Sequence, residues 1–110
     1  IATPRSQQLF DKFMALLTIH HNRERSVSFY ADRLCLTPNY LSGAIKESSG
    51  RSAMEWINEY VVTEAKMMLK STDESIQSIS YHLHFSTQSA FGKYFKQQTG
   101  MGPKVYRNKE

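Results

Sequence analysis

The chain has 110 residues, of which 40% are hydrophobic and 22% charged, proportions that are ordinary for a globular protein. Fourteen Lys and Arg against ten Asp and Glu give a formal charge of +4, which is compatible with a polyanionic partner but does not establish one. A single cysteine excludes an internal disulfide and favours a reducing compartment, so we expect a cytoplasmic location. No apolar run is long enough to span a membrane, and we expect no membrane partner.

The first segment is predicted to be an amphipathic helix that begins at Thr3 and Pro4. Threonine suits the N-cap, and proline suits the first helical position because its missing N–H would have no partner there. The apolar residues then recur at three- and four-residue steps as far as a charged turn over 22–25. These residues are Leu9, Phe10, Phe13, Met14 and Leu17. We expect this helix to support the fold by packing.

Two short helices joined by a tight turn are predicted next. Ser28 is expected to cap the first of them, and Thr37 with Pro38 to begin a second that ends before Gly50. Because the turn over 35–37 is so short, the two helices must cross steeply, as in a helix-turn-helix unit. The residues expected to form their shared core are Leu34, Leu36, Leu41 and Ile45.

The central stretch Ser52–Lys70 is predicted to form one long amphipathic helix. Ser52 and Glu55 have the spacing of a capping box, in which each side chain satisfies a backbone N–H at the helix start. No Gly or Pro interrupts the stretch, and its apolar residues follow the helical period. These are Ala53, Ile57, Tyr60, Val61, Ala65, Met68 and Leu69. At about 1.5 Å per residue the helix would span roughly 27 Å, so we expect a rigid spacer between two modules.

The segment after the central helix repeats the design of the first helix-turn-helix unit. Ser75 is expected to cap a helix over 76–83, and a second helix is expected over 87–99, before Gly100. Matching residues occur in the same order in both copies, which indicates a duplicated module. The pairs are Val27 with Ile76, Ala31 with Ser80, Leu34 with Leu83, Cys35 with His84, Leu36 with Phe85, Leu41 with Phe91, Ile45 with Phe95 and Lys46 with Lys96.

These elements predict an all-α fold of about seven helices, in which two helix-turn-helix units are joined by a long central helix. Residues 1–50 would hold the N-terminal helix and the first unit, residues 51–71 the linker helix, and residues 72–110 the second unit with a short C-terminal helix. Val105 and Tyr106 in that last helix are expected to complete the core of the second unit.

The second unit carries a specific set of residues in a fixed order. They are Phe85-Ser86-Thr87-Gln88-Ser89, then Phe91, Phe95-Lys96, Gly100, Pro103 and Tyr106-Arg107. In order and spacing this set resembles the C-terminal signature of the AraC/XylS family of bacterial transcription regulators, and residues 34–42 resemble the first unit of that family.

The resemblance implies a domain that binds double-stranded DNA sequence-specifically, with recognition helices over 37–49 and 87–99 in adjacent major grooves. It also implies a regulatory domain, usually N-terminal, that senses an effector or dimerises. This function suggests RNA polymerase as a further partner. It also suggests that this protein acts as an activator of transcription.

The chain departs from the family pattern in one turn and in the first recognition helix. His84 stands where the second unit usually has Gly, and His tolerates a left-handed backbone better than most residues. Gly43 stands where the first recognition helix usually carries Arg, which removes a contact to a base or a phosphate.

Polar and cationic residues in the N-terminal part of each recognition helix are the candidate DNA contacts. A major groove admits one α-helix and presents a distinct pattern of donors and acceptors for each base pair. Gln88 or Asn39 can pair bidentately with adenine, whereas Lys93 can read guanine or neutralise a phosphate. The full set is Thr37, Asn39, Tyr40, Ser42, Lys46, Ser86, Thr87, Gln88, Ser89, Lys93 and Lys96.

Other classes of function have weaker support in the sequence. No paired carboxylates, nucleophile–base spacing or phosphate-binding loop indicates an enzyme, and we expect no cofactor. Cys35, His82 and His84 do not have the spacing of a zinc site, so we expect no metal. The main alternative is a helical protein-interaction module that contacts a transcription partner. An RNA-binding role is disfavoured because nothing resembles an exposed aromatic stacking platform.

Overall fold

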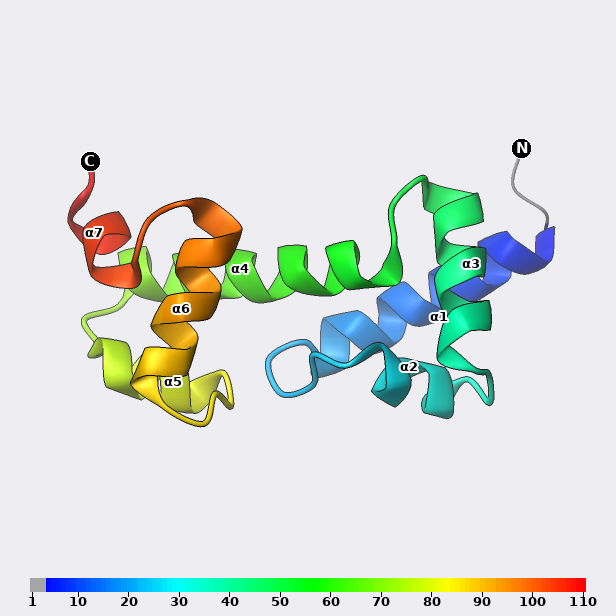
Figure 1. The fold of residues 1–110 in the computed structure, drawn as a ribbon, viewed down its shortest axis with the longest axis horizontal. Coiled ribbons are helices and arrows are strands. Elements are labelled where there is room, and N and C mark those ends of the chain that lie inside the picture. The colour runs from blue at the N-terminus through cyan, green and yellow to red at the C-terminus, as the bar shows by residue number, and fades with distance from the viewer. Residues whose placement is uncertain (1–3) are drawn as a thin grey trace. The chain divides into compact units, whose positions relative to one another are not determined.

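A computed structural model describes residues 4–110, in which all of the regular secondary structure is helical. The helices of this part of the chain are α1 (Pro4–His20), α2 (Val27–Arg33), α3 (Pro38–Ser49), α4 (Ala53–Ser71), α5 (Ile76–His82), α6 (Gln88–Thr99) and α7 (Pro103–Asn108) (Figure 1). The predicted all-α fold with two helix-turn-helix pairs, α2–α3 and α5–α6, is confirmed. The N-cap expected at Thr3 lies outside the described residues.

The helices group into two compact units, an N-terminal unit (Ile1–Tyr60) and a C-terminal unit (Val61–Glu110). The helix α4 begins in the first of these and ends in the second. The division into three segments at residues 50 and 71 stays a prediction from the sequence.

In the N-terminal unit, α1 packs against α2 and α3, and α2 packs against α3. The ring of Phe13 meets the ring of Tyr30 edge to face at a centroid distance of 5.4 Å. The Tyr30 hydroxyl donates to the carbonyl of Glu24 (2.9 Å), so this buried side chain leaves no donor without a partner. Burial, with the nearby Glu24 carboxylate, raises the pKa of Tyr30 to about 12. The buried residues of the three helices include Leu9, Phe13, Leu17, Tyr30, Ala31, Leu41 and Ile45.

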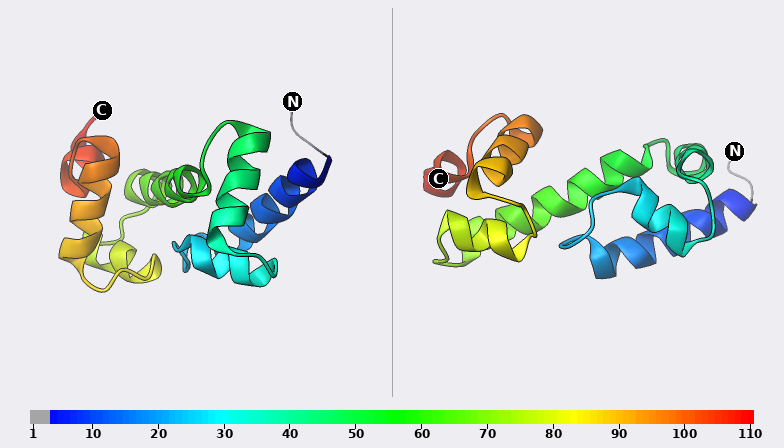
Figure 2. Two further views of the ribbon diagram at one scale, coloured as in Figure 1. Left: turned by 45° about the vertical axis from the view of Figure 1, so that its right-hand side comes forward. Right: turned by 60° about the horizontal axis from the view of Figure 1, so that its bottom comes forward.

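In the C-terminal unit, α5 packs against α6, and α6 packs against α7 (Figure 2). The centroid of the Phe91 ring lies 5.2 Å from that of the Phe85 ring and 5.9 Å from that of the Phe95 ring. The core of the unit consists of Ala65, Leu69, Ile79, Leu83, Phe91 and Phe95. The second half of α4 therefore supplies one side of this core, and the helix-turn-helix pair supplies the rest.

The short helix α7 is held by one aromatic contact and by the last turn of α4. The ring of Tyr106 packs against that of Phe95 at 5.5 Å, which confirms the predicted role of Tyr106. Arg107 donates from Nε to the carbonyl of Leu69 (2.8 Å) and from Nη2 to that of Thr72 (3.3 Å). These bonds satisfy carbonyls that a helix end leaves without partners. The predicted core role of Val105 is wrong, because its side chain is 61% exposed.

The tight turns of the two helix-turn-helix pairs have the same backbone conformation. Cys35 and His84 both adopt a left-handed backbone with φ 58°. In each turn the N–H of the next residue donates back into the preceding helix, to the carbonyl of Ala31 (2.9 Å) or Ser80 (3.0 Å). This is the hydrogen-bond pattern of a Schellman motif. Ala31 and Ser80 are both buried, so the structure confirms the match between the two copies.

The helices α3 and α6 also have matching lengths and ends. Each has 12 residues. The hydroxyl oxygen of Thr37 accepts from the N–H of Tyr40 (3.2 Å), and that of Thr87 accepts from the N–H of Ala90 (3.0 Å). Gly50 and Gly100 follow the two helices with φ of 78° and 87°. Residues of α3 therefore correspond to residues 50 positions later in α6.

The N-cap of α2 is Ser26, so the cap predicted at Ser28 is wrong. Ser26 has an extended backbone, and its hydroxyl oxygen accepts from the N–H of Ser28 (3.1 Å). Ser75 plays the same part for α5 by accepting from the N–H of Ser78 (3.0 Å), as the sequence predicted.

The capping box at the start of α4 is present as predicted, and its contribution to the free energy of unfolding should be measurable. The hydroxyl of Ser52 accepts from the N–H of Glu55 (3.1 Å), while the Glu55 carboxylate accepts from the N–H of Ser52 (2.9 Å). Ser52→Ala removes the first of these bonds, so we expect the free energy of unfolding to fall by about 0.5–2 kcal/mol. Urea denaturation followed by circular dichroism measures this loss. Ser52→Gly should cost less, and equal midpoints for Ser52→Ala and the unmodified chain would contradict the prediction.

Candidate nucleic-acid interface

The helix α6 separates a buried face from a polar face. Phe91 and Phe95 are fully buried in the core. Polar residues of the same helix are exposed, including Gln88 and Ser89 in its first turn and Lys93 one turn later. Lys96, near the end of α6, is exposed as well. The apolar side of α6 thus fixes which side chains reach solvent.

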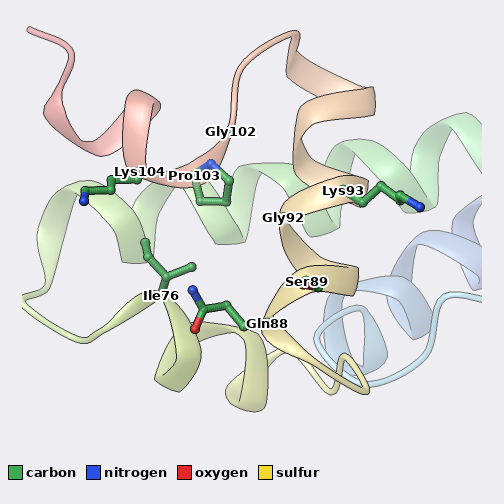
Figure 3. Close-up of a pocket in the computed structure, with 8 residues that line it drawn as sticks. All are labelled: Ile76, Gln88, Ser89, Gly92, Lys93, Gly102, Pro103 and Lys104. Atoms are coloured by element: carbon green, nitrogen blue, oxygen red, sulfur yellow. The ribbon is translucent and has the colours of Figure 1, made fainter.

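The exposed residues at the start of α6 line a hollow of about 620 Å³ (Figure 3). Its other walls come from Ile76 of α5 and from residues 102–104 at the start of α7. Figure 3 shows Gln88 extending toward Ile76, whereas Lys93 and Lys104 lie at opposite sides of the hollow. An amide that can donate and accept is therefore flanked by two cations, a combination suited to a polyanion with hydrogen-bonding edges.

The helix α3 presents a comparable polar face in the N-terminal unit. Asn39, Tyr40 and Lys46 are exposed, whereas Ser42 is half-buried. The Tyr40 side chain is 45% exposed, and its hydroxyl oxygen accepts from Nε of Arg5 (2.9 Å). The exposed ring of Tyr40 can contact the methyl groups of DNA bases, and the amide of Asn39 can form hydrogen bonds with polar base edges.

The predicted residues at the helix starts have a structural role in addition to their candidate role as DNA contacts. Thr37 and Thr87 are N-caps whose oxygens accept a backbone N–H, as described above. A hydroxyl that accepts one bond keeps its own hydrogen, so both residues can still donate to a phosphate. Ser86 is exposed in the turn before α6, next to Thr87.

The structure brings the predicted residues together in two groups, one in each unit. Gln88, Ser89 and Lys93 share the hollow beside α7, and Asn39 and Tyr40 share a smaller hollow beside α1. Two cations that sequence reasoning did not select line these hollows, Arg5 in the N-terminal unit and Lys104 in the C-terminal one. Arg5 is far from α3 in the sequence and only tertiary packing brings it there. Lys104 follows Pro103, whose position as a helix start was a usable signal.

A carboxylate beside α5 holds the start and the end of that helix together. Oε1 of Glu74 accepts from the hydroxyl of Ser78 (2.8 Å) and lies 2.9 Å from Nε2 of His82. The hydrogen bond from Ser78 lowers the pKa of Glu74, and the charge and hydrogen bond of His82 lower it further. This arrangement supports the helix that precedes the turn into α6.

The lowered pKa of Glu74 predicts a specific loss of stability in acid. Because the pKa is lower in the folded than in the unfolded chain, Glu74 contributes stability above its unfolded pKa, about 4.3. That contribution should be lost as the pH falls through the folded pKa. Urea midpoints measured from about pH 6 to 3 should therefore converge for the unmodified chain and Glu74→Gln. Ser78→Ala should weaken the same dependence, and a constant difference between the unmodified chain and Glu74→Gln would contradict the assignment.

Residues 4–110 contain neither a candidate metal site nor a candidate membrane-spanning helix. In that part of the chain no three His, Cys, Asp or Glu side chains come together in a way that would hold a metal ion. Nor does any helix of the same residues combine the length and the hydropathy needed to cross a membrane.

Comparisons with known proteins agree with this geometry. A family model described as a helix-turn-helix domain matches residues 30–109. The HTH-type transcriptional regulator YobQ of Bacillus subtilis is 37% identical over 71 residues, which are 64% of this chain and 30% of that protein. The arabinose operon regulatory protein of Escherichia coli is 28% identical over 81 residues, which are 74% of this chain and 28% of that protein. The chain thus spans less than a third of either relative.

A solved structure shares the fold. The DNA-binding domain of AdpA, a global transcriptional factor crystallised in complex with a target DNA, is similar with a TM-score of 0.76 and 20% identity. The similarity covers 89% of this chain and 88% of that one. The family model, which matches most of the chain, and the relatives show that the chain belongs to the AraC-type helix-turn-helix family of DNA-binding transcription regulators.

Proposed function

We propose that this chain binds double-stranded DNA sequence-specifically by placing α6 and α3 in adjacent major grooves. The observation that carries the proposal is the first turn of α6, where Gln88 and Ser89 are exposed beside Lys93 and above a fully buried Phe91. An exposed helix start with an amide, a hydroxyl and a cation matches the donors and acceptors that a major groove presents. The matching start of α3 supports a second contact of the same kind.

Different residues of each helix would have different tasks. Gln88 and Asn39 can each form two hydrogen bonds with adenine, at N6 and N7, and so specify a base pair. Lys46, Lys93 and Lys96 bring positive charge to the phosphates or to guanine. Phosphate contacts hold the helix in register without reading the sequence. Ser42, Ser86, Ser89, Thr37 and Thr87 would donate hydroxyl hydrogens to bases or phosphates.

The long helix and the comparisons support a two-groove contact. α4 runs for 19 residues without a break, which corresponds to about 28 Å. Major grooves on one side of a duplex repeat at about 34 Å, and the length of α4 is of the same order as that repeat. The AdpA domain, which has the same fold, was crystallised with a target DNA.

The partners of the whole protein are a further part of the proposal. YobQ and the arabinose operon regulator are more than three times as long as the segments that match this chain. Their length supports an additional effector-sensing or dimerisation domain in the whole protein, and their names support a role in transcription. We therefore also propose RNA polymerase as a partner, a cytoplasmic location and activation of transcription as the outcome of binding.

Selection of bound duplexes from a random pool tests the proposed function. Sequence-specific binding should enrich a motif, and contact by both units should enrich two blocks one helical turn apart. The alternative is a protein-interaction module, which would enrich no motif. Salt separates the two independently, because log K for DNA falls linearly with log salt, whereas a mainly apolar protein interface responds little. Absence of both an enriched motif and a salt dependence would remove DNA as the ligand.

The contribution of Lys93 can be predicted from its charge and exposure. If Lys93 neutralises one phosphate, Lys93→Ala should reduce the slope of log K against log salt by about 0.9 and weaken binding to all sequences. If it reads guanine, preference at one base pair should relax instead. Titration by fluorescence anisotropy at several salt concentrations distinguishes these results. Lys12→Ala, an exposed lysine on α1, is the control, and equal effects of the two variants would remove Lys93 from the site.

A further inference from the structure

The two recognition helices differ in charge at one matched position. Residues of α3 correspond to residues 50 positions later in α6, as the N-caps Thr37 and Thr87 show. Gly43 therefore occupies the place that Lys93 has in α6. The Gly43 position is open, since a Cβ built there would meet no atom within 4 Å among the described residues. The polar face of α3 thus lacks a side-chain cation where α6 has one.

A cation from another helix lies beside this open position. Arg5, in the first turn of α1, lines the same hollow of about 450 Å³ as Gly43, Asn39 and Tyr40. Nε of Arg5 donates to the Tyr40 hydroxyl (2.9 Å), and the guanidinium carbon lies 5.8 Å from the centroid of the Tyr40 ring. The side chain of Arg5 is therefore held against a residue of the polar face of α3.

The backbone that carries Arg5 is also fixed to α3. Ser6, the next residue, is 5% exposed, and its hydroxyl donates to the carboxylate of Glu47. Glu47 lies one turn beyond Gly43 on the same helix. Because α1 packs directly against α3, the position of Arg5 depends on the core of the unit as well as on these two polar contacts. Arg5 is thereby placed before any ligand arrives.

We propose that Arg5 is a DNA-contacting residue that supplies the cation missing at Gly43, by donating to a phosphate at the edge of the groove entered by α3. This inference rests on the proposed function. A guanidinium has five N–H donors, of which the bond to Tyr40 uses one. The guanidinium of Arg5 comes from α1, outside the recognition helix, so it would reach the duplex beside α3. From there it can contact the phosphates more readily than the base edges. Arginine also pairs bidentately with phosphate oxygens.

Arg5→Ala tests this role by salt titration on a selected duplex. Loss of one phosphate contact should lower the slope of log K against log salt by about 0.9 and the affinity about fivefold at 0.15 M salt. Arg5→Lys should keep the slope, because it keeps the charge. Adding Gly43→Lys to Arg5→Ala should restore the slope, since the open position accepts a side chain. Tyr40→Phe should keep the slope and lower the affinity less than Arg5→Ala.

The outcomes separate this inference from the proposed function. If the unmodified chain binds no duplex, the proposed function fails and Arg5 has no such role. If the unmodified chain binds the duplex and Lys93→Ala weakens that binding, but Arg5→Ala changes neither the slope of log K against log salt nor the affinity, only the inference about Arg5 is overturned. A loss of preference at one base pair with an unchanged slope would also overturn it, because Arg5 would then read a base. The thermal unfolding midpoint of Arg5→Ala, if unchanged, assigns the loss to binding.

Discussion

Phe91→Ala should destabilise the C-terminal unit by about 3–5 kcal/mol, the cost of removing a buried phenylalanine side chain and leaving a cavity. The Phe91 ring is fully buried and lies against the rings of Phe85 and Phe95. The unit has only 50 residues, from Val61 to Glu110. A stability of about 0.05–0.15 kcal/mol per residue gives roughly 2.5–7.5 kcal/mol for such a unit, so the substitution removes a large share of it.

Urea denaturation of the variant, with circular dichroism and tyrosine fluorescence, measures this loss. Val105→Ala is the control, since that exposed residue in the same unit should change stability by less than about 0.5 kcal/mol. Contact with DNA through α6 should weaken together with stability, because Phe91 determines which face of α6 is exposed. A variant with unchanged midpoint would mean that the aromatic cluster does not hold the unit together.

The ends of the helices were the most predictable feature of the fold. The sequence predicts Thr37 and Thr87 at helix starts and Gly50 and Gly100 beyond helix ends, and all four have those positions. Such residues act through local chemistry, a hydroxyl that accepts a backbone N–H or a backbone with positive φ, so the neighbouring sequence is enough to identify them. The duplication made these signals stronger, because each copy repeated the other.

Features that depend on tertiary contacts were not predictable in the same way. Ser26 and Ser28 are chemically equivalent as N-caps, and only the extended backbone at Ser26 decides between them. Val105 and Tyr106 are adjacent in a helix of six residues, too short for periodicity to show which of them faces the core. The position of Arg5 beside Tyr40 results from the packing of α1 on α3 across 35 residues of sequence. The candidate contacts on α3 and α6 were found because they belong to single helices.

Gln88→Ala should abolish preference at one base pair of the recognised sequence. A bidentate contact between a glutamine amide and adenine discriminates by about 1–3 kcal/mol, or roughly five- to 150-fold in affinity. Gln88 is the first residue of α6 and is exposed, and its amide extends along the hollow toward Ile76 (Figure 3). Helix α6 entering a groove by its N-terminal end would present this amide to the base edges first.

Competition binding against duplexes changed at single positions measures the effect. Gln88→Ala should bind the preferred duplex more weakly than the unmodified chain does. On a duplex changed at the base pair that Gln88 contacts, the two proteins should have similar affinities. The slope of log K against log salt should stay the same. Gln97→Ala is the matched control, because that exposed glutamine lies nine residues further along α6, about half a turn around the helix axis. If Gln88→Ala instead weakened all duplexes equally, Gln88 would be a phosphate contact. In that case Ser89 and Lys93 would remain as the residues of the hollow that could read the sequence.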